Sequence, residues 1–160
     1  MTSKLFAILL FFSAFIPLNA FSADSDLPAI LVFGDSLSAA YGIEEEEGWV
    51  SLLDKRIKEE DLPFRVVNGS VSGETSTGGV VRLPGMLSTY RPKVVILELG
   101  GNDGLRGLPL ELLEDNLNKM VDMIHETGSS ALLAGIQIPP NYGPRYTVPF
   151  TQLFLSLIHI

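Results

Sequence analysis

The sequence predicts one α/β domain built on a parallel sheet with helices on both faces. Short apolar runs alternate with longer segments of helical periodicity, in the order βαβαβαβα. The first three apolar runs each end in a polar, glycine-rich stretch. The length of 160 residues suits about one domain. Ligands of such sheets bind at the carboxyl ends of the strands, so we expect the functional site there.

The first half of the chain supplies two strands and one helix. Residues 29–33, AILVF, form a continuous apolar run with β-branched members, which is typical of a strand buried on both faces. Residues 49–60 place apolar side chains at helical spacing, with the charges elsewhere. Residues 64–68, FRVVN, form a second short strand after Pro63.

The second half repeats the alternation. We expect a weaker helix over 76–90, although Gly78, Gly79 and Pro84 constrain it. The further elements are a strand over 93–100, an amphipathic helix over 109–127 that stops at Gly128, a strand over 131–136, and a helical piece from about Tyr146.

The first 22 residues resemble a signal peptide. Lys4 precedes the apolar stretch LFAILLFFSAFIPL, and small residues follow in NAFSA. We expect cleavage between Ala20 and Ala23 and a periplasmic or secreted product. An uncleaved membrane anchor is the alternative, but the stretch is short for a span, which needs about 20 apolar residues.

Charge and composition exclude several classes of function. Removing the leader leaves 10 basic and 19 acidic residues, a net charge of −9, which argues against electrostatic binding of nucleic acid. The chain has no cysteine, so a thiol nucleophile and a cysteine-ligated zinc are excluded. The four acids Glu44–Glu47 are interpreted as a solvated loop or first helical turn.

Three polar side chains or backbone groups are candidates for chemistry. Ser36 follows the first strand, where it either caps a helix or acts as a nucleophile. Asn102 follows the third strand, where its amide either satisfies loop backbone or donates to an oxyanion. Gly73 follows the second strand, where it either permits a turn or lets its N–H approach the same oxyanion. All three are expected at one edge of the sheet.

Three motifs then resemble the GDSL or SGNH hydrolase family. They are GDSL at 34–37, SVSGETS at 70–76 and LGGND at 99–103. The resemblance covers about residues 29–154 and is strongest to small bacterial arylesterases, acyl-CoA-type thioesterases and lysophospholipases. It implies a flavodoxin-like three-layer α/β/α sandwich.

The resemblance also implies roles. Ser36 would form an acyl-enzyme with a small acyl ester or thioester, and its N–H, the Gly73 N–H and the Asn102 side chain would form the oxyanion hole. Asp35 and Asp103 would brace the loops, and residues 139–146 would border the acyl groove. No metal or organic cofactor is implied.

The general base is the missing part. The family supplies it from an Asp-x-x-His block in a loop after a further strand. His125 falls late in the helix predicted over 109–127, and His159 has Ser156 where the family has aspartate. We predict that neither histidine is catalytic, that the catalytic Asp and His are absent, and that the chain as written is nearly inactive.

The last six residues, LSLIHI, suggest a reason for the missing block. The string CTGTCTCTTATACACATC encodes them, and it resembles a transposon-end adapter of sequencing libraries. We therefore expect a domain over 23–154, with its last strand and helix missing, and a non-native tail over 155–160. A non-catalytic acyl- or glycan-binding module with the same cleft is the alternative function. A nucleotide-binding protein is disfavoured, because no G-x-G-x-x-G or P-loop lysine motif is present.

Overall fold

The computed structural model describes residues 26–157, so the predicted leader and His159 lie outside the described part. The strands are β1 (Ala29–Gly34), β2 (Arg65–Asn68), β3 (Val94–Glu98) and β4 (Ser130–Leu133). The helices are α1 (Trp49–Glu59), α2 (Ser76–Tyr90), α3 (Gly101–Leu105), α4 (Leu110–Glu126) and α5 (Pro144–Leu157), with 3-10 turns η2 (Glu45–Glu47) and η3 (Pro140–Tyr142).

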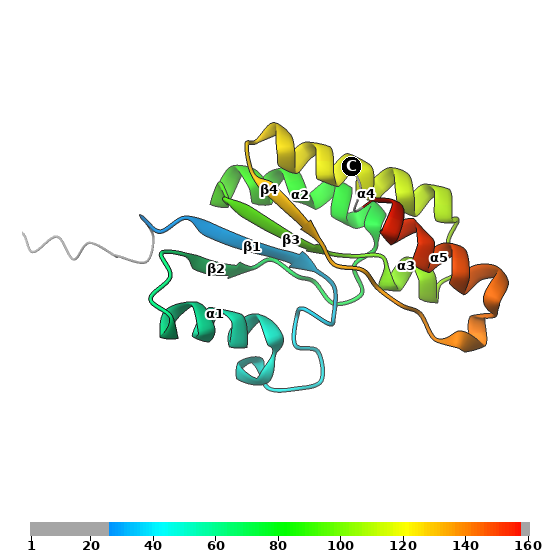
Figure 1. The fold of residues 1–160 in the computed structure, drawn as a ribbon, viewed down its shortest axis with the longest axis horizontal. Helices are drawn as coiled ribbons and strands as arrows, with labels where there is room; N and C mark the ends of the chain where they lie inside the picture. Colours follow the sequence, from blue (N-terminus) through cyan, green and yellow to red (C-terminus); the bar gives the residue numbers. More distant parts are fainter. Residues whose placement is uncertain (1–25, 158–160) are drawn as a thin grey trace, which may run out of the picture.

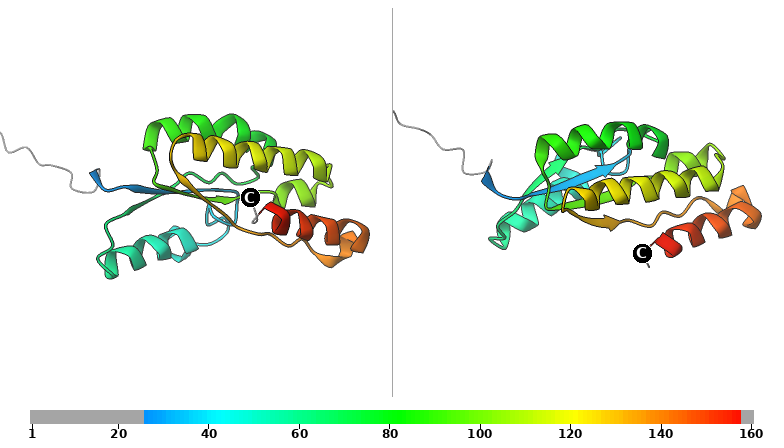
Figure 2. Two further views of the ribbon diagram at one scale, coloured as in Figure 1. Left: turned by 45° about the horizontal axis from the view of Figure 1, so that its top comes forward. Right: turned by 90° about the horizontal axis from the view of Figure 1, so that it is seen from above.

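The strands form one parallel sheet in the order β2-β1-β3-β4, as the alternating pattern predicted (Figure 1). Helix α1 covers one face of the sheet, and α2 and α4 cover the other, which gives three layers (Figure 2). Because β2 and β3 lie on opposite sides of β1, the order of the strands reverses there. The crevice between the carboxyl ends of β1 and β3 is therefore the position at which such sheets bind ligands.

The main core lies between the sheet and the helices α2 and α4. Leu31 and Phe33 of β1 and Leu97 of β3 are fully buried, and they meet Leu117 and Met120 of α4. Each such side chain contributes about 1.5–3 kcal/mol through its burial. This core fixes the register of the strands, and so it also fixes where their carboxyl ends point.

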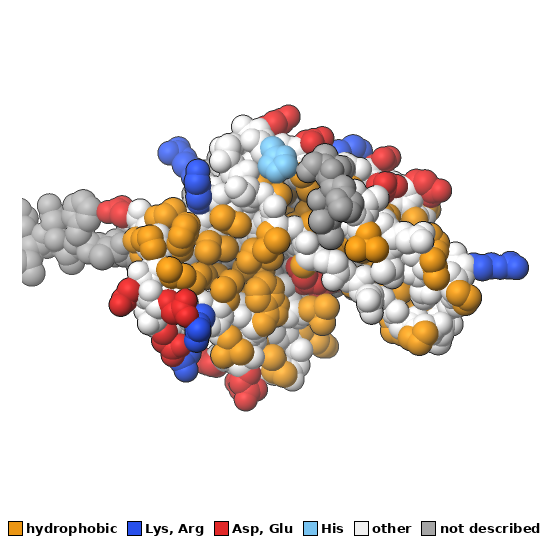
Figure 3. Space-filling model, in the orientation of Figure 1, with side chains coloured by type: hydrophobic (Ala, Val, Ile, Leu, Met, Phe, Trp, Pro, Cys, Tyr) orange, Lys and Arg blue, Asp and Glu red, His pale blue; other side chains and the backbone are white. Residues whose placement is uncertain are grey.

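The opposite face of the sheet is covered less completely. Val50 and Ile57 of α1 are buried against it, but Ile30 and Ile96 are only partly buried and Leu132 is 57% exposed. Hydrophobic side chains accordingly gather over the strands, between α1 and the helices α2 and α4 (Figure 3). Among the helices that the structure describes, none has the length and apolar content to cross a membrane.

Three local features differ from the predicted elements. Strand β4 ends at Leu133 instead of continuing to Ile136, and the chain then runs along the sheet edge toward α5. Helix α3 was not predicted, because the glycine-rich sequence GNDGL has little helix propensity of its own. Residues 35–43 form a series of turns and bends, where the sequence had suggested the start of a helix.

Candidate active site

Ser36 lies on a tight turn directly after β1. The Asp35 side chain closes this turn, because its Oδ1 accepts a hydrogen bond from the Leu37 N–H at 3.0 Å. The backbone bonds from Ala39 N–H to Asp35 O and from Tyr41 N–H to Ser36 O continue the turns. No regular helix follows, so the helix-capping interpretation of Ser36 is wrong. Among the described residues, neither the Ser36 hydroxyl nor its N–H has a hydrogen-bond partner.

Asn102 joins the loops that follow β1, β2 and β3. It lies in the first turn of α3, which begins after Gly100 with a φ of +120°. Its Nδ2 donates to Asp35 Oδ2 at 3.0 Å and to the Glu74 carbonyl at 2.9 Å. One amide group therefore holds the Ser36 turn and the Gly73–Glu74 loop together.

Asp35 is the buried carboxylate that accepts hydrogen bonds from both Asn102 and the Leu37 N–H. It is 2% exposed, and burial raises the pKa of its carboxyl above the ordinary value. The hydrogen bonds from Leu37 and Asn102 lower the pKa in part, and the charge of Asp103 raises it. Asp35 thus orients both the serine turn and the asparagine, which matches the bracing role expected for it.

Gly73 occupies an exposed position with a φ of +80°, a conformation that favours glycine. Its carbonyl accepts a hydrogen bond from Arg106 Nη2 at 3.0 Å, and its N–H has no acceptor within residues 26–157. The neighbouring Glu74 is fixed by Arg82, whose Nε lies 2.8 Å from Glu74 Oε2. The Gly73 N–H is therefore a free donor on a braced loop.

Asp103 braces the start of α2. Its carboxylate accepts hydrogen bonds from the Ser76 N–H at 2.9 Å and the Ser76 hydroxyl at 2.6 Å. Asn116 of α4 donates to the same hydroxyl at 3.0 Å. This buried network connects α2, α3 and α4 immediately beside the loop that carries Gly73.

A cavity of ≈ 220 Å³ opens beside Ser36 and Asn102. Pro139 lines it, as predicted for the segment 139–146, while Tyr142 and Tyr146 instead donate to the carbonyls of Leu105 and Leu108. The segment 136–138 after β4 supplies one side of the cavity, and its sequence carries no sign of that position. Its lining residues are Asp35, Ser36, Leu37, Gly101, Asn102, Leu105, Ile136, Gln137, Ile138 and Pro139.

His125, the histidine among residues 26–157, does not belong to this site. His159 lies outside the described residues. Asp122 and His125 have the Asp-x-x-His spacing, but they lie within α4 and not in a loop after a strand. The last turn of α4 precedes the start of β4, whereas Ser36 follows the end of β1, so His125 lies at the opposite edge of the parallel sheet.

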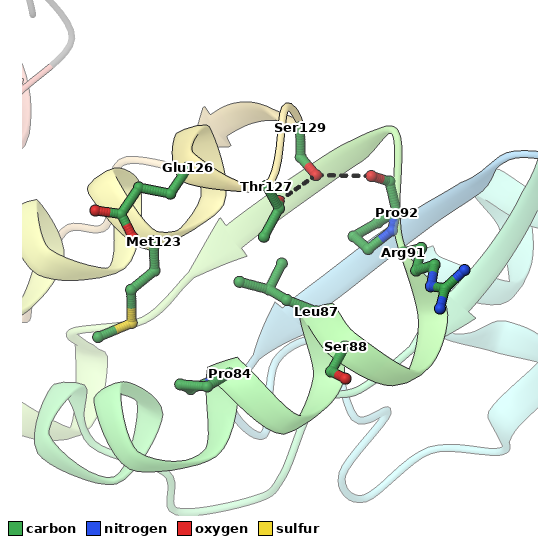
Figure 4. A pocket seen from close by; sticks show the side chains of 9 residues that line it. All are labelled: Pro84, Leu87, Ser88, Arg91, Pro92, Met123, Glu126, Thr127 and Ser129. Atoms are coloured by element: carbon green, nitrogen blue, oxygen red, sulfur yellow. Dashed lines mark hydrogen bonds between the residues drawn. The ribbon is translucent and has the colours of Figure 1, made fainter.

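A larger cavity, of ≈ 680 Å³, lies between the carboxyl-terminal halves of α2 and α4 (Figure 4). Leu87 and Met123 supply apolar surface there, and the Ser129 hydroxyl donates to the Pro92 carbonyl. This cavity carries the hydroxyl groups of Ser88, Thr127 and Ser129, but none of the candidate residues that follow the strands lines it. Within the described part of the chain, no cluster of three or more His, Asp or Glu side chains is arranged to hold a metal ion.

Comparison with known proteins gives consistent matches. The model of the GDSL-like Lipase/Acylhydrolase family matches residues 32–153. Esterase TesA of Pseudomonas aeruginosa is 50% identical over 125 residues, which cover 78% of this chain and 62% of that protein. An arylesterase of Vibrio mimicus is 41% identical over 154 residues, which cover 96% of this chain and 74% of that protein.

Solved structures agree with the sequence matches. A crystal structure of TesA superposes with a TM-score of 0.78 at 49% identity, over 80% of this chain and 71% of that one. AlinE4, a SGNH-hydrolase family esterase, gives a TM-score of 0.79 at 33% identity, over 84% of this chain and 72% of that one. The chain thus spans 62% of the length of the P. aeruginosa esterase that it matches.

Proposed function

The chain belongs to the GDSL-like lipase/acylhydrolase family, and on that premise we propose that the protein is a serine ester hydrolase acting through an acyl-Ser36 intermediate. The observation that supports this most is the position of Asn102, whose amide joins the Ser36 turn to the Gly73–Glu74 loop. Ser36 is half-buried and lines the cavity, whereas Gly73 lies outside the cavity lining, and the N–H groups of both have no acceptor among the described residues.

In the proposed reaction, Ser36 Oγ attacks the acyl carbon of the ester or thioester and its proton passes to a general base. The carbonyl oxygen becomes an oxyanion, which the Ser36 N–H, the Gly73 N–H and the Asn102 amide stabilise. Collapse expels the alcohol or thiol with that proton, and water then releases the acid from Ser36 by the same steps.

Asn102 must change a hydrogen bond to take part. Both of its amide hydrogens are engaged, one with Asp35 Oδ2 and one with Glu74 O. We propose that one of them turns to the oxyanion as negative charge develops there. Removing one such donor raises the barrier by about 2.7–4 kcal/mol where this has been measured.

We propose that the base is supplied by a further part of the protein. Serine needs an adjacent base to be an effective nucleophile, and among the described residues no histidine lines the cavity beside Ser36. The chain covers 62% of the length of esterase TesA. We therefore propose that an Asp-x-x-His block lies in a segment of the protein outside these 160 residues. The polypeptide as given is expected to be nearly inactive.

Substrate class and location are proposed on the same grounds. Relatives named as an esterase, an arylesterase and a thioesterase/lysophospholipase support small acyl esters or thioesters, with lysophospholipids among them. The leader-like residues 1–22 support export to the periplasm or beyond.

The test uses the protein expressed from its complete gene. Hydrolysis of p-nitrophenyl acyl esters is measured for the wild type, for Ser36→Ala and for the control Ser88→Ala, a serine exposed on α2. We expect Ser36→Ala to lose nearly all activity and Ser88→Ala to keep it. Equal rates for wild type and Ser36→Ala would rule out Ser36 as the nucleophile, whereas no hydrolysis by the wild type would favour a binding module.

A further inference from the structure

A glutamate lies buried under the serine turn, where an apolar side chain would be expected. Glu98 ends β3 after the apolar run Val94–Leu97, and it is 7% exposed. Burying a carboxyl group is costly, and replacing buried charged groups with apolar ones is often neutral or stabilising. A buried acid at this position therefore calls for a role other than stability.

The Glu98 carboxyl holds Ser38, two residues after Ser36. Its Oε2 accepts a hydrogen bond from the Ser38 hydroxyl at 2.7 Å. Its Oε1 is buried and has no hydrogen-bond partner among the described residues. Ser38 is 1% exposed, so the pair is closed off from solvent.

Gly34 makes room for this pair. It lies opposite Glu98 in the β1–β3 register, and a Cβ there would come within 2.7 Å of Ser38 Oγ and 2.8 Å of Glu98 Oε2. The first residue of the GDSL motif is thus glycine because the side chains of Ser38 and Glu98 occupy the space that a Cβ would need.

Ser38 is also held from the other side of β1. Its carbonyl accepts a hydrogen bond from Asn68 Nδ2 at 2.8 Å, and Asn68 ends β2. The turn that carries Ser36 is therefore attached to β2 through Asn68 and to β3 through Glu98.

The surroundings of Glu98 shift the pKa of its carboxyl in both directions, with the raising effects larger. Burial raises the pKa of its carboxyl, and the negative charge of Asp35 raises it further. The Ser38 hydroxyl and the Asp35 backbone N–H lower the pKa in part. The charge of Asp103, on α3, raises the pKa of Asp35. It is not among the causes that shift the pKa of Glu98.

We propose that Glu98 is a positioning residue for Ser36, which it orients through the Ser38 hydroxyl. This rests on the proposed function, because it assigns a role in the attack by Ser36. Glu98 contacts no part of the crevice that would hold substrate, since the cavity lining does not include it. Its loss should therefore lower kcat and leave KM unchanged.

The test compares variants of the protein from the complete gene. We expect Glu98→Ala to lower kcat roughly 10- to 100-fold, since a misplacement of about 1 Å costs about 100-fold. Ser38→Ala should give a similar loss, and the double variant should lose no more than either single one. Glu98→Gln keeps the shape and the acceptor oxygen, so it should restore most of kcat, and the exposed Glu114→Ala should match the wild type.

The outcomes separate the two proposals. Activity in Ser36→Ala would refute the proposed function. Loss of activity in Ser36→Ala together with unchanged kcat in Glu98→Ala would overturn only the role of Glu98, as would fully additive losses in the double variant. If Glu98→Ala fails to fold, Ser38→Ala decides, because it removes a single hydroxyl; an unchanged kcat there would overturn the proposal.

Discussion

Gly34→Ala is the perturbation whose magnitude the structure determines most directly. The added Cβ would lie 2.7 Å from Ser38 Oγ, 2.8 Å from Glu98 Oε2 and 2.9 Å from the Glu98 carbonyl. The last of these atoms is backbone in the centre of the sheet, so it cannot move aside cheaply. The strand conformation of Gly34 suits alanine, so the effect is steric and not conformational.

The expected cost has two parts. Overpacking a buried site costs about 1–3 kcal/mol. Separating Ser38 from Glu98 leaves buried polar groups unpaired, which costs about a further 1–3 kcal/mol. We therefore expect the free energy of unfolding to fall by about 2–6 kcal/mol.

The measurement is urea unfolding of the protein, with Gly85→Ala as the matched control. A Cβ on Gly85 meets nothing within 4 Å, and Gly85 lies inside α2. Alanine there should stabilise the protein by about 0.5–1 kcal/mol. With an m value of about 1–3 kcal/mol/M, the two midpoints should differ by roughly 1–7 M. Equal midpoints would refute the packing described around Gly34.

Three further predictions concern the Asp103–Ser76 hydrogen bonds, the Arg56–Glu60 ion pair and the two buried carboxyl groups. Asp103→Ala removes both acceptors of Ser76 at the start of α2 and should lower the unfolding free energy by about 2–4 kcal/mol in urea. Arg56→Ala breaks an exposed ion pair with Glu60 and should change the free energy of unfolding by less than about 1 kcal/mol. A larger loss would show that this ion pair matters for stability. The raised pKa values of Asp35 and Glu98 mean that the folded state retains protons that the unfolded state loses above the ordinary values of 3.8 and 4.5. The free energy of unfolding should therefore fall as pH rises through the folded pKa values. Urea unfolding midpoints measured across this pH range should decline less in Glu98→Gln than in the wild type.

The fold was largely predictable, because strands buried in a parallel sheet appear as uninterrupted apolar runs. The run at 29–33 and the helix at 109–127 were each placed within two residues of β1 and α4. The exceptions depend on tertiary contacts. Helix α3 forms from GNDGL because Gly104 packs closely, with Ile138 and Phe150 within 2.7 Å of the position of a Cβ.

The sequence identified which residues belong to the candidate site, but it did not predict the hydrogen bonds between them. Ser36 and Asn102 were identified because each follows a strand, and both line the same cavity. The sequence could not reveal that Asp35 connects them, since residues 35 and 102 are distant along the chain. Glu98 was missed because one acid at the end of an apolar run is indistinguishable from an ordinary strand terminus. Its place beside the LGGND motif was the one available signal.

Ser36 Oγ is the nucleophile that we propose becomes acylated, and covalent trapping tests this role most directly. The protein from the complete gene is treated with an alkyl p-nitrophenyl phosphonate, and the modified peptide is mapped by mass spectrometry. We expect one adduct per chain, on Ser36, formed in step with the loss of esterase activity, and no adduct in Ser36→Ala. Complete inactivation with Ser36 unmodified would show that another group is the nucleophile.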